Sequence, residues 1–180
     1  MLQRPPTLTM RPATADDEKP LAELIHARSD WLQARGLADW HAAADELAAQ
    51  AADPEIPTWV LTANVVEVIG CTTLYEESPA SLWTAQERAE PAIFMATTVI
   101  DPAYAGQRIG CHLAWWVLDY AARAGRTAVR RGTIEPGLVR YYRDAQGWTV
   151  VRAIHRGGVT VTGLSRPATR MPDLRVTSTY

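Results

Sequence analysis

Hydrophobic and polar positions along the chain change their period in a way that predicts a regular order of strands and helices. Runs rich in apolar and β-branched residues predict strands at 8–11, 59–61, 65–75, 93–100, 127–131, 148–155 and 159–164. Apolar residues repeated every three or four positions predict helices between Thr14 and Gly36, between Asp39 and Pro54, and at 113–124 and 137–146. This order of elements indicates an α/β or α+β fold with a mixed sheet.

The 180 residues, of which 47% are hydrophobic, are enough for one sizeable core. We expect a single domain over residues 7–165, with an N-terminal tail at 1–6. Residues 166–180 are polar and contain two prolines, so a loosely held C-terminal tail is expected there. The stretch at 78–91 is mixed in character and predicts a surface loop, with room for a helical turn.

The strand at 93–100 and the helix at 113–124 are joined by Asp101-Pro-Ala-Tyr-Ala-Gly-Gln-Arg-Ile-Gly-Cys-His112. Gly106 and Gly110 allow backbone angles at which several main-chain N–H groups converge. The start of the following helix adds unpaired N–H groups and the positive end of its dipole, an arrangement that binds phosphate. An ordinary strand-to-helix turn also fits this pattern, so the loop alone leaves both interpretations open.

The charge and the cysteine content indicate which partners and which cellular compartment to expect. The net charge is −2 and no basic tract stands out, so nucleic acid is not an expected partner. No run is long enough to cross a bilayer and the first residues lack the apolar stretch of a signal peptide, so no membrane partner and a cytoplasmic location are expected. Cys71 and Cys111 lie in segments predicted to be buried, which favours free thiols over a disulfide.

Several kinds of catalytic site find no support in the sequence. The four histidines lack the spacing of metal ligands, so no metal site is expected. There is no G-x-S-x-G elbow and no G-x-G-x-x-G fingerprint. Lys19 is the sole lysine and none follows the loop, which disfavours a nucleotide triphosphatase.

Three segments together resemble the GNAT superfamily of N-acetyltransferases. Tyr104-Ala-Gly-Gln-Arg-Ile-Gly110, after Val99-Ile-Asp-Pro102, is similar to that family's acetyl-CoA loop. Arg140-Tyr-Tyr-Arg-Asp-Ala-Gln-Gly-Trp148 resembles its late helix, and Arg11-Pro-Ala-Thr14 its usual opening, so the likeness covers roughly residues 8 to 165. Trp31-Leu-Gln-Ala-Arg-Gly36 and Leu82-Trp-Thr84 resemble the actinobacterial-type members.

The resemblance implies a mixed, splayed central sheet of about six to seven strands flanked by about four helices. It also implies that acetyl-CoA is the co-substrate and that loop amides bind its pyrophosphate. In this chain those residues are Ala105, Gly106, Gln107, Arg108, Ile109, Gly110 and Cys111. The main chain of Thr98, Val99 and Ile100 would pair with the pantetheine arm, and the thioester would lie where two parallel strands splay apart.

The implied reaction is transfer of the acetyl group to a primary amine, expected to belong to a small molecule, by direct attack without an acyl-enzyme. An alkylamine with a pKa of about 10.4 must lose a proton before it attacks. The family often uses a tyrosine of the late helix to protonate the CoA thiolate, and we expect Tyr142 in that role, with a core aromatic as the alternative. The general base stays open among Glu76, Glu77, Glu90 and Asp101, or a chain of water molecules.

The acceptor pocket is expected around the 31–40 elbow, residues 75–77 and the 78–91 loop. The residues predicted to contact the acceptor are Trp31, Trp40, Tyr75, Glu77 and Trp83. Carboxylates in this region would suit a cationic amine.

The chain departs from the family pattern at several positions. Ala105 stands where Arg or Gln is usual, and Arg108 where Gly is usual, which bears on affinity for CoA. Tyr142 is one residue farther from Gly147 than usual, and Glu135 replaces a common asparagine. Two alternatives therefore remain, a non-catalytic acyl-CoA-binding module and a protein-interaction domain on the same fold. The resemblance also makes a homodimer reasonable.

Overall fold

The computed structural model describes residues 6–179, so the predicted N-terminal tail lies outside the described residues except for Pro6. Across the described residues, eight strands and five α-helices form a mixed α/β fold with an open sheet, which confirms the predicted fold class. Two elements raise the counts above those predicted, although the sequence left room for a helical turn at the first of them. These are a four-residue helix, α3 (Ala85–Arg88), inside the 78–91 loop, and a strand, β8 (Val176–Ser178), inside the predicted C-terminal tail.

The chain packs as two compact units, which are described separately. The first comprises residues 1–73, 97–112 and 175–180, and the second residues 74–96 and 113–174, within the limits of the described residues. The predicted domain boundaries at residues 7 and 165 stay predictions.

The first unit is built on strands β1 (Leu8–Pro12), β2 (Thr58–Ala63) and β3 (Glu67–Tyr75). β2 pairs antiparallel with both β1 and β3, and β8 pairs parallel with β1. Residues 176–178 are therefore not part of a loose tail, because their main chain is bound to β1. Asn64 and Val65 take positive φ values of 50° and 79°, which sets the turn between β2 and β3.

Two helices close the core of this unit, α1 (Glu18–Gln33) and α2 (Ala44–Ala52). Leu21, Leu24 and Ile25 of α1 share one face, as the periodicity predicted, and are at most 3% exposed. They pack with the alanines of α2 and with Val60, Cys71 and Val99 from the strands. The small alanine side chains let the two helices approach each other closely.

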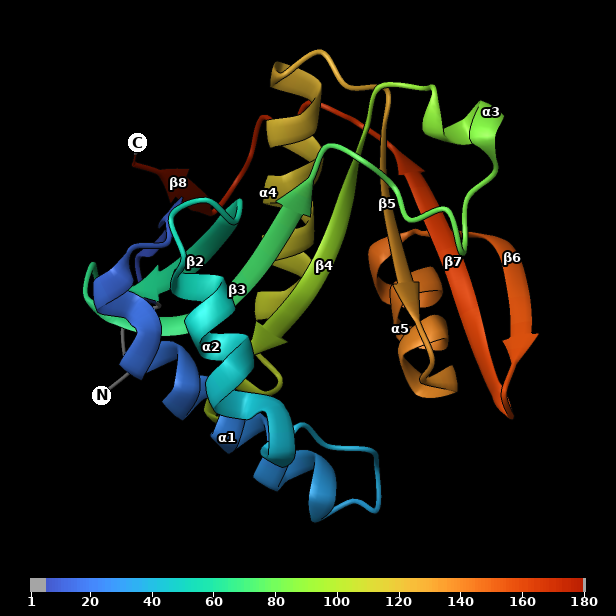
Figure 1. The fold of residues 1–180 in the computed structure, drawn as a ribbon. Coiled ribbons are helices and arrows are strands. Elements are labelled where there is room, and N and C mark those ends of the chain that lie inside the picture. Colours follow the sequence, from blue (N-terminus) through green and yellow to red (C-terminus); the bar gives the residue numbers. More distant parts are fainter. Residues whose placement is uncertain (1–5, 180) are drawn as a thin grey trace. The chain divides into compact units, whose positions relative to one another are not determined.

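The second unit contains β5 (Ala128–Thr133), β6 (Thr149–Arg156) and β7 (Val159–Pro167), with β7 antiparallel to both neighbours (Figure 1). Gly157 and Gly158, both with positive φ, make the tight β6–β7 turn that the sequence predicted. The helix α5 (Pro136–Gln146) ends at Gly147 in the left-handed conformation, with φ of 73°. Most of α4 (Ile109–Arg123) also belongs to this unit.

The strand β4 (Ala92–Ile100) contributes its first residues to the second unit and its last residues to the first. Its parallel pairing with β5 covers Ala92–Phe94 against Ala128–Arg130, whereas β5 continues to Thr133. Within the second unit, the parallel pairing of the two strands therefore stops before β5 ends. Among the described residues, no helix combines the length and apolar character needed to span a bilayer.

Candidate active site

The turn between β4 and α4 is held to β3 by polar contacts within the first unit. Asp101 Oδ1 accepts a 2.8 Å hydrogen bond from the amide of Ala103. The amide of Asp101 donates to the carbonyl of Ile69 at 2.9 Å. The phenol of Tyr104 donates to Glu67 Oε2 at 2.9 Å. Burial, and next the bond to Glu67, raise the pKa of Tyr104 to about 12, so the phenol keeps its proton at neutral pH.

The backbone amides of the turn divide into two groups. The amides of Ala105, Gln107 and Cys111 donate to carbonyls of the turn itself, at 2.9 to 3.2 Å. The amides of Gly106, Ile109 and Gly110 have no acceptor among the described residues. Of the seven residues predicted to bind pyrophosphate, three therefore offer unused N–H groups, two in the first turn of the 15-residue helix α4 and one, Gly106, in the turn before it. Unused donors at such a position attract an anion.

Two residues give the turn its shape. Gly106 has φ of 81°, and Arg108, where a glycine was expected from the resemblance, has φ of 57°. A side chain in this left-handed region costs about 1 kcal/mol, which glycine would not. The Arg108 side chain is exposed and adds a positive charge beside the unused amides.

The last residues of β4 are the predicted pairing strand for pantetheine. Thr98 Oγ1 and Thr72 Oγ1 lie 2.9 Å apart in a hydrogen bond, and Val99 is 2% exposed in the core. Thr97, just before them, has φ of 42°, an unusual angle for a β-branched residue. Its carbonyl accepts from the Cys71 thiol at 3.7 Å. Strain of this kind concentrates at functional sites, which is in keeping with a binding role for this strand.

The two cysteines are free and buried, as the sequence predicted. Burial raises the pKa of the Cys71 thiol to about 12, so it is protonated and unreactive at neutral pH. Cys111 lies in the first turn of α4 and is fully buried. Among residues 6–179 no group of three or more His, Cys, Asp or Glu side chains is arranged to hold a metal ion.

In the second unit, Tyr142 lies on α5 and is 8% exposed. The guanidinium carbon of Arg131, on β5, lies 3.5 Å from the centroid of its ring, a cation–π contact. Arg131 is 4% exposed, burial lowers its pKa, and its Nε has no hydrogen-bond partner in the described residues. Tyr142 thus packs as a core aromatic, the alternative kept open above, and its hydroxyl role stays a prediction. Tyr141, its neighbour, is 38% exposed.

Three of the four candidate general bases already have partners. Glu76 pairs with Arg126 at 2.7 Å and Glu90 with Arg130 at 2.6 Å. Asp101 caps the turn described above. Glu77 is exposed and has no polar partner among the described residues. The choice of base therefore stays open, with Glu77 the least engaged.

The predicted acceptor residues fall into both units. Trp31 is covered by two guanidiniums, those of Arg28 and Arg35, at 4.3 and 3.7 Å from its ring centroid. Trp40 and Tyr75 are each 38% exposed. Trp83 is 3% exposed. Whether Trp31, Trp40, Tyr75, Glu77 and Trp83 contact an acceptor stays a prediction.

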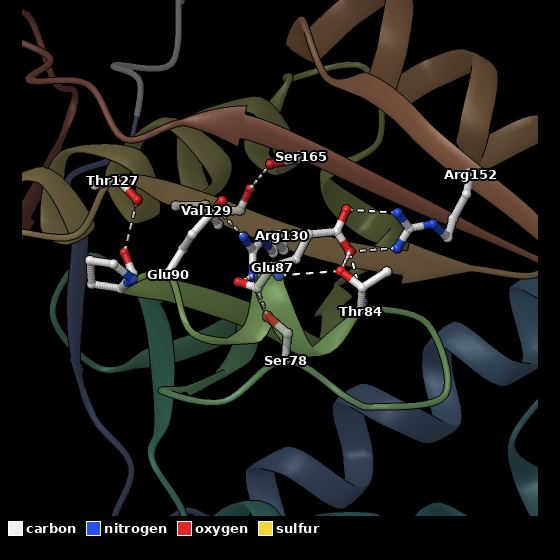
Figure 2. Close-up of polar contacts among 10 residues, drawn as sticks. Ser78, Thr84, Glu87, Glu90, Thr127, Val129, Arg130, Arg152 and Ser165 are labelled. Carbon is white, nitrogen blue, oxygen red and sulfur yellow. Dashed lines mark hydrogen bonds and ion pairs between the residues drawn. The ribbon is translucent and has the colours of Figure 1, made fainter.

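The 78–91 loop is fastened to the sheet of the second unit by two arginines that the sequence analysis did not identify (Figure 2). Arg152 of β6 donates to both carboxylate oxygens of Glu87 at 2.6 Å. Arg130 of β5 donates to Glu90 Oε2 and to the Glu87 carbonyl, each at 2.6 Å. Both guanidiniums lie over Trp83, at 4.9 Å for Arg130 and 5.7 Å for Arg152, which explains why this indole is buried.

Glu87 also forms part of the N-terminal cap of the short helix α3. Its amide donates to Thr84 Oγ1, and its carboxylate accepts from the Thr84 amide at 2.8 Å, a capping box. The hydrogen bonds from Arg152, and next from Thr84, lower the pKa of Glu87 to about 2. The Thr-x-x-Glu spacing was a signal in the sequence for this cap.

Leu82 fixes the loop at a third point. A side chain at Gly132 would come within 3.0 Å of Leu82 Cδ2, and one at Gly163 within 3.2 Å of Leu82 Cγ. These two glycines are direct neighbours on β5 and β7. Because neither glycine has a side chain, the sheet has a depression at this point, and the side chain of Leu82 fills it.

Beside Leu82 the second unit contains a cavity of about 410 Å³. Its walls come from the loop, from Phe94 of β4, from residues 132–134, and from Ile154, Arg156 and Val161 of the β6–β7 hairpin. A cavity of this size and apolar character suits a small organic molecule. Three residues of the predicted acceptor loop, Pro79, Ser81 and Leu82, line it, whereas Trp83 does not.

Comparison with known proteins identifies relatives of this architecture. The model of the acetyltransferase (GNAT) family matches residues 22–148. A GNAT-family acetyltransferase from Listeria monocytogenes has a similar structure, with a TM-score of 0.70 at 12% identity over 89% of this chain and 94% of that one. The putative acetyltransferase yncA of Salmonella typhimurium, solved with its cofactor acetyl-CoA, gives 0.60 at 18% identity over 93% and 98%.

A mutant spermidine N-acetyltransferase from Vibrio cholerae gives a TM-score of 0.63 at 16% identity over 90% of this chain and 94% of that one. No curated protein matches the sequence. At such identities the structural likenesses show the fold alone, and the match of the family model over residues 22–148 carries the relationship.

Proposed function

Because this chain belongs to the GNAT family of acetyltransferases, we propose that it transfers the acetyl group of acetyl-CoA to a primary amine of a small molecule. Membership confirms the family predicted from the loop and the late helix. The actinobacterial-type subdivision, a homodimer and a cytoplasmic location stay predictions.

The observation that carries the proposal is the set of unused amides at Gly106, Ile109 and Gly110. Their donors, the dipole of α4 and the charge of Arg108 fit the pyrophosphate of CoA. Ala105 supplies no polar side chain, so main-chain donors take the larger share of phosphate binding here. Thr98, Val99 and Ile100 would bind the pantetheine arm through their main chain.

Acetyl-CoA supplies an activated thioester, and the chain needs to orient it and to manage two protons. The amine must be deprotonated before it attacks, a step for which Glu77 or solvent is available. The thiolate that leaves has a reference pKa of about 8.5, so a nearby acid assists its departure. We assign that proton to the phenol oxygen of Tyr142. No covalent acyl-enzyme is part of the proposal.

The test is an assay of acetyl transfer across a panel of primary amines, with product mass and released thiol measured together. Tyr142→Phe keeps the ring against Arg131 and removes the hydroxyl, so it separates packing from proton transfer. A general acid contributes about 100-fold or more, so kcat should fall by about that factor. The control is Tyr141→Phe, which removes the exposed neighbouring hydroxyl and should leave kcat unchanged.

Other outcomes favour the alternatives. Equal kcat for wild type and Tyr142→Phe would remove the tyrosine from the mechanism and leave the transferase intact. Binding of acetyl-CoA without turnover of any amine would favour a non-catalytic acyl-CoA-binding module. Failure to bind acetyl-CoA would favour a protein-interaction domain.

A further inference from the structure

One face of the β5–β7–β6 sheet in the second unit carries three arginines. Side chains alternate between the faces of a strand, so Arg152, Ile154 and Arg156 of β6 share a face. Arg130 of β5 lies on the same face, because both it and Arg152 reach the 78–91 loop (Figure 2). Apolar residues and glycines fill the space between these cations.

The chain neutralises two of the three arginines itself. Glu90 pairs with Arg130 and Glu87 pairs with Arg152, each at 2.6 Å. Arg152 also donates to the carbonyl of Leu82 at 2.9 Å. The loop thus provides one carboxylate for each of these two guanidiniums.

Arg156 is the exception. It lies at the end of β6 and lines the cavity beside Leu82. Its guanidinium makes no ion pair, hydrogen bond or cation–π contact among residues 6–179. The other residues that line the cavity include no Asp, Glu, His or Lys.

From this arrangement we propose that the cavity binds the acceptor as an apolar primary amine that carries a carboxylate, with Arg156 as the group that pairs with it. This inference rests on the proposed function and specifies its substrate class, that of an apolar amino acid. Phe94, Ile154 and Val161 would contact the apolar side chain. The ligand's carboxylate would pair with Arg156, as Glu90 pairs with Arg130 and Glu87 with Arg152.

The same features disfavour a polyamine such as spermidine. A polycation needs carboxylates, and the walls of this cavity provide a cation instead. The expectation from the sequence that carboxylates near residues 75–77 suit a cationic amine is therefore not carried into this proposal. Ser81 and Thr133 are the neutral polar side chains of the cavity walls.

The first experiment measures product binding by calorimetry, so it does not depend on turnover. N-acetyl-L-phenylalanine and N-acetyl-2-phenylethylamine differ only in the carboxylate. The wild type should bind the first about tenfold more tightly, a typical contribution of one charge-assisted hydrogen bond. Arg156→Gln should remove this preference. Arg88→Gln, at an exposed arginine of the same unit that does not line the cavity, should keep it.

A second variant tests the location. Val161→Trp fills the cavity from β7 and should abolish binding of both compounds, while its circular dichroism and unfolding midpoint show whether it folds. Equal affinity of the wild type for the two compounds, no binding of either, or an unchanged preference in Arg156→Gln would each overturn the inference.

The kinetic arm separates this inference from the proposed function. With acetyl-CoA, L-phenylalanine should be acetylated with a higher kcat/KM than 2-phenylethylamine or spermidine, and Arg156→Gln should raise KM for L-phenylalanine about tenfold with little change in kcat. Preferred turnover of spermidine would overturn the substrate class and leave the transferase standing. Absence of all turnover would contradict the proposed function, with the binding data still deciding the inference.

Discussion

The loop at 105–111 and the loop at 78–91 are held in shape by different means. The loop offers backbone amides from residues 106–110, shaped by two positive φ angles within a short stretch. The 78–91 loop is held by side chains, with Arg130 and Arg152 reaching Glu90 and Glu87 across 40 and 65 residues of sequence. One site is local and made of main chain, whereas the other is non-local and made of side chains.

This difference determines which amino-acid substitutions each region tolerates. Backbone donors survive most side-chain substitutions and fail when a new Cβ or a changed φ blocks them. Side-chain clamps fail when one partner is truncated, because a buried polar group loses its bond. The two regions should therefore respond to opposite kinds of mutation.

The largest effect is expected from breaking the clamp at its buried end. Arg130 is 3% exposed, so Arg130→Met leaves the Glu87 carbonyl and Ser78 hydroxyl without their donor. Urea denaturation should show a loss of about 2 kcal/mol in the free energy of unfolding. Affinity for acetyl-CoA should stay unchanged. The exposed control Arg88→Met should cost under about 0.5 kcal/mol, and a similarly small loss for Arg130→Met would contradict the clamp.

A smaller effect on stability is expected from replacing Arg108 in the 105–111 loop. Arg108→Gly relieves the left-handed strain at φ of 57°, partly offset by the greater freedom of glycine in the unfolded chain. The free energy of unfolding should rise by about 0.5 kcal/mol. Affinity for CoA should fall, and more so at low salt, because a positive charge is lost. Arg108→Ala loses the charge but keeps the strain, so it should share only the weaker affinity. A destabilised Arg108→Gly variant would contradict the strain.

The smallest effect concerns the pH dependence of the clamp. Glu87 has a pKa of about 2 in the folded state against 4.5 for the ordinary group, so its stabilisation is complete above pH 4.5 and is lost as the pH falls toward 2. Glu87→Gln preserves the capping box, and its unfolding midpoint should lie below that of the wild type at neutral pH. The gap should close between pH 4.5 and 2. A gap that stays constant with pH would show that the ion pair contributes nothing.

The sequence predicted the local features well. The β4–turn–α4 segment, the β6–β7 turn at Gly157 and Gly158, and the α5 stop at Gly147 all depend on glycines and periodicity within a few residues. The resemblance predicted seven pyrophosphate-binding residues, and three of them donate their amides back into the turn. That internal use depends on the backbone angles of the turn, which the residue pattern of the motif does not specify.

The non-local features were missed for one physical reason. Arg152 pairs with Glu87 because the fold brings β6 and the 78–91 loop together. The two residues are 65 positions apart, and nothing in the sequence near one indicates the other. The two arginines that lie over Trp83 could not be inferred for the same reason, and its predicted contact with an acceptor stays a prediction. β8 was missed because three residues are too few to show a period, and its partner β1 lies more than 160 residues away in the sequence.

The most direct test of the central claim is a thermal-unfolding titration with acetyl-CoA on three proteins. Gly110 and Gly137 are each the second residue of a helix, α4 and α5, so Gly110→Leu and Gly137→Leu are matched changes that helix propensity favours. At about a hundred times the dissociation constant, acetyl-CoA should stabilise the wild type and Gly137→Leu by about 2.7 kcal/mol. Gly110→Leu, folded but with its amide site obstructed, should show no shift. A wild type that does not respond to acetyl-CoA, or a Gly110→Leu variant that responds as fully, would contradict the account.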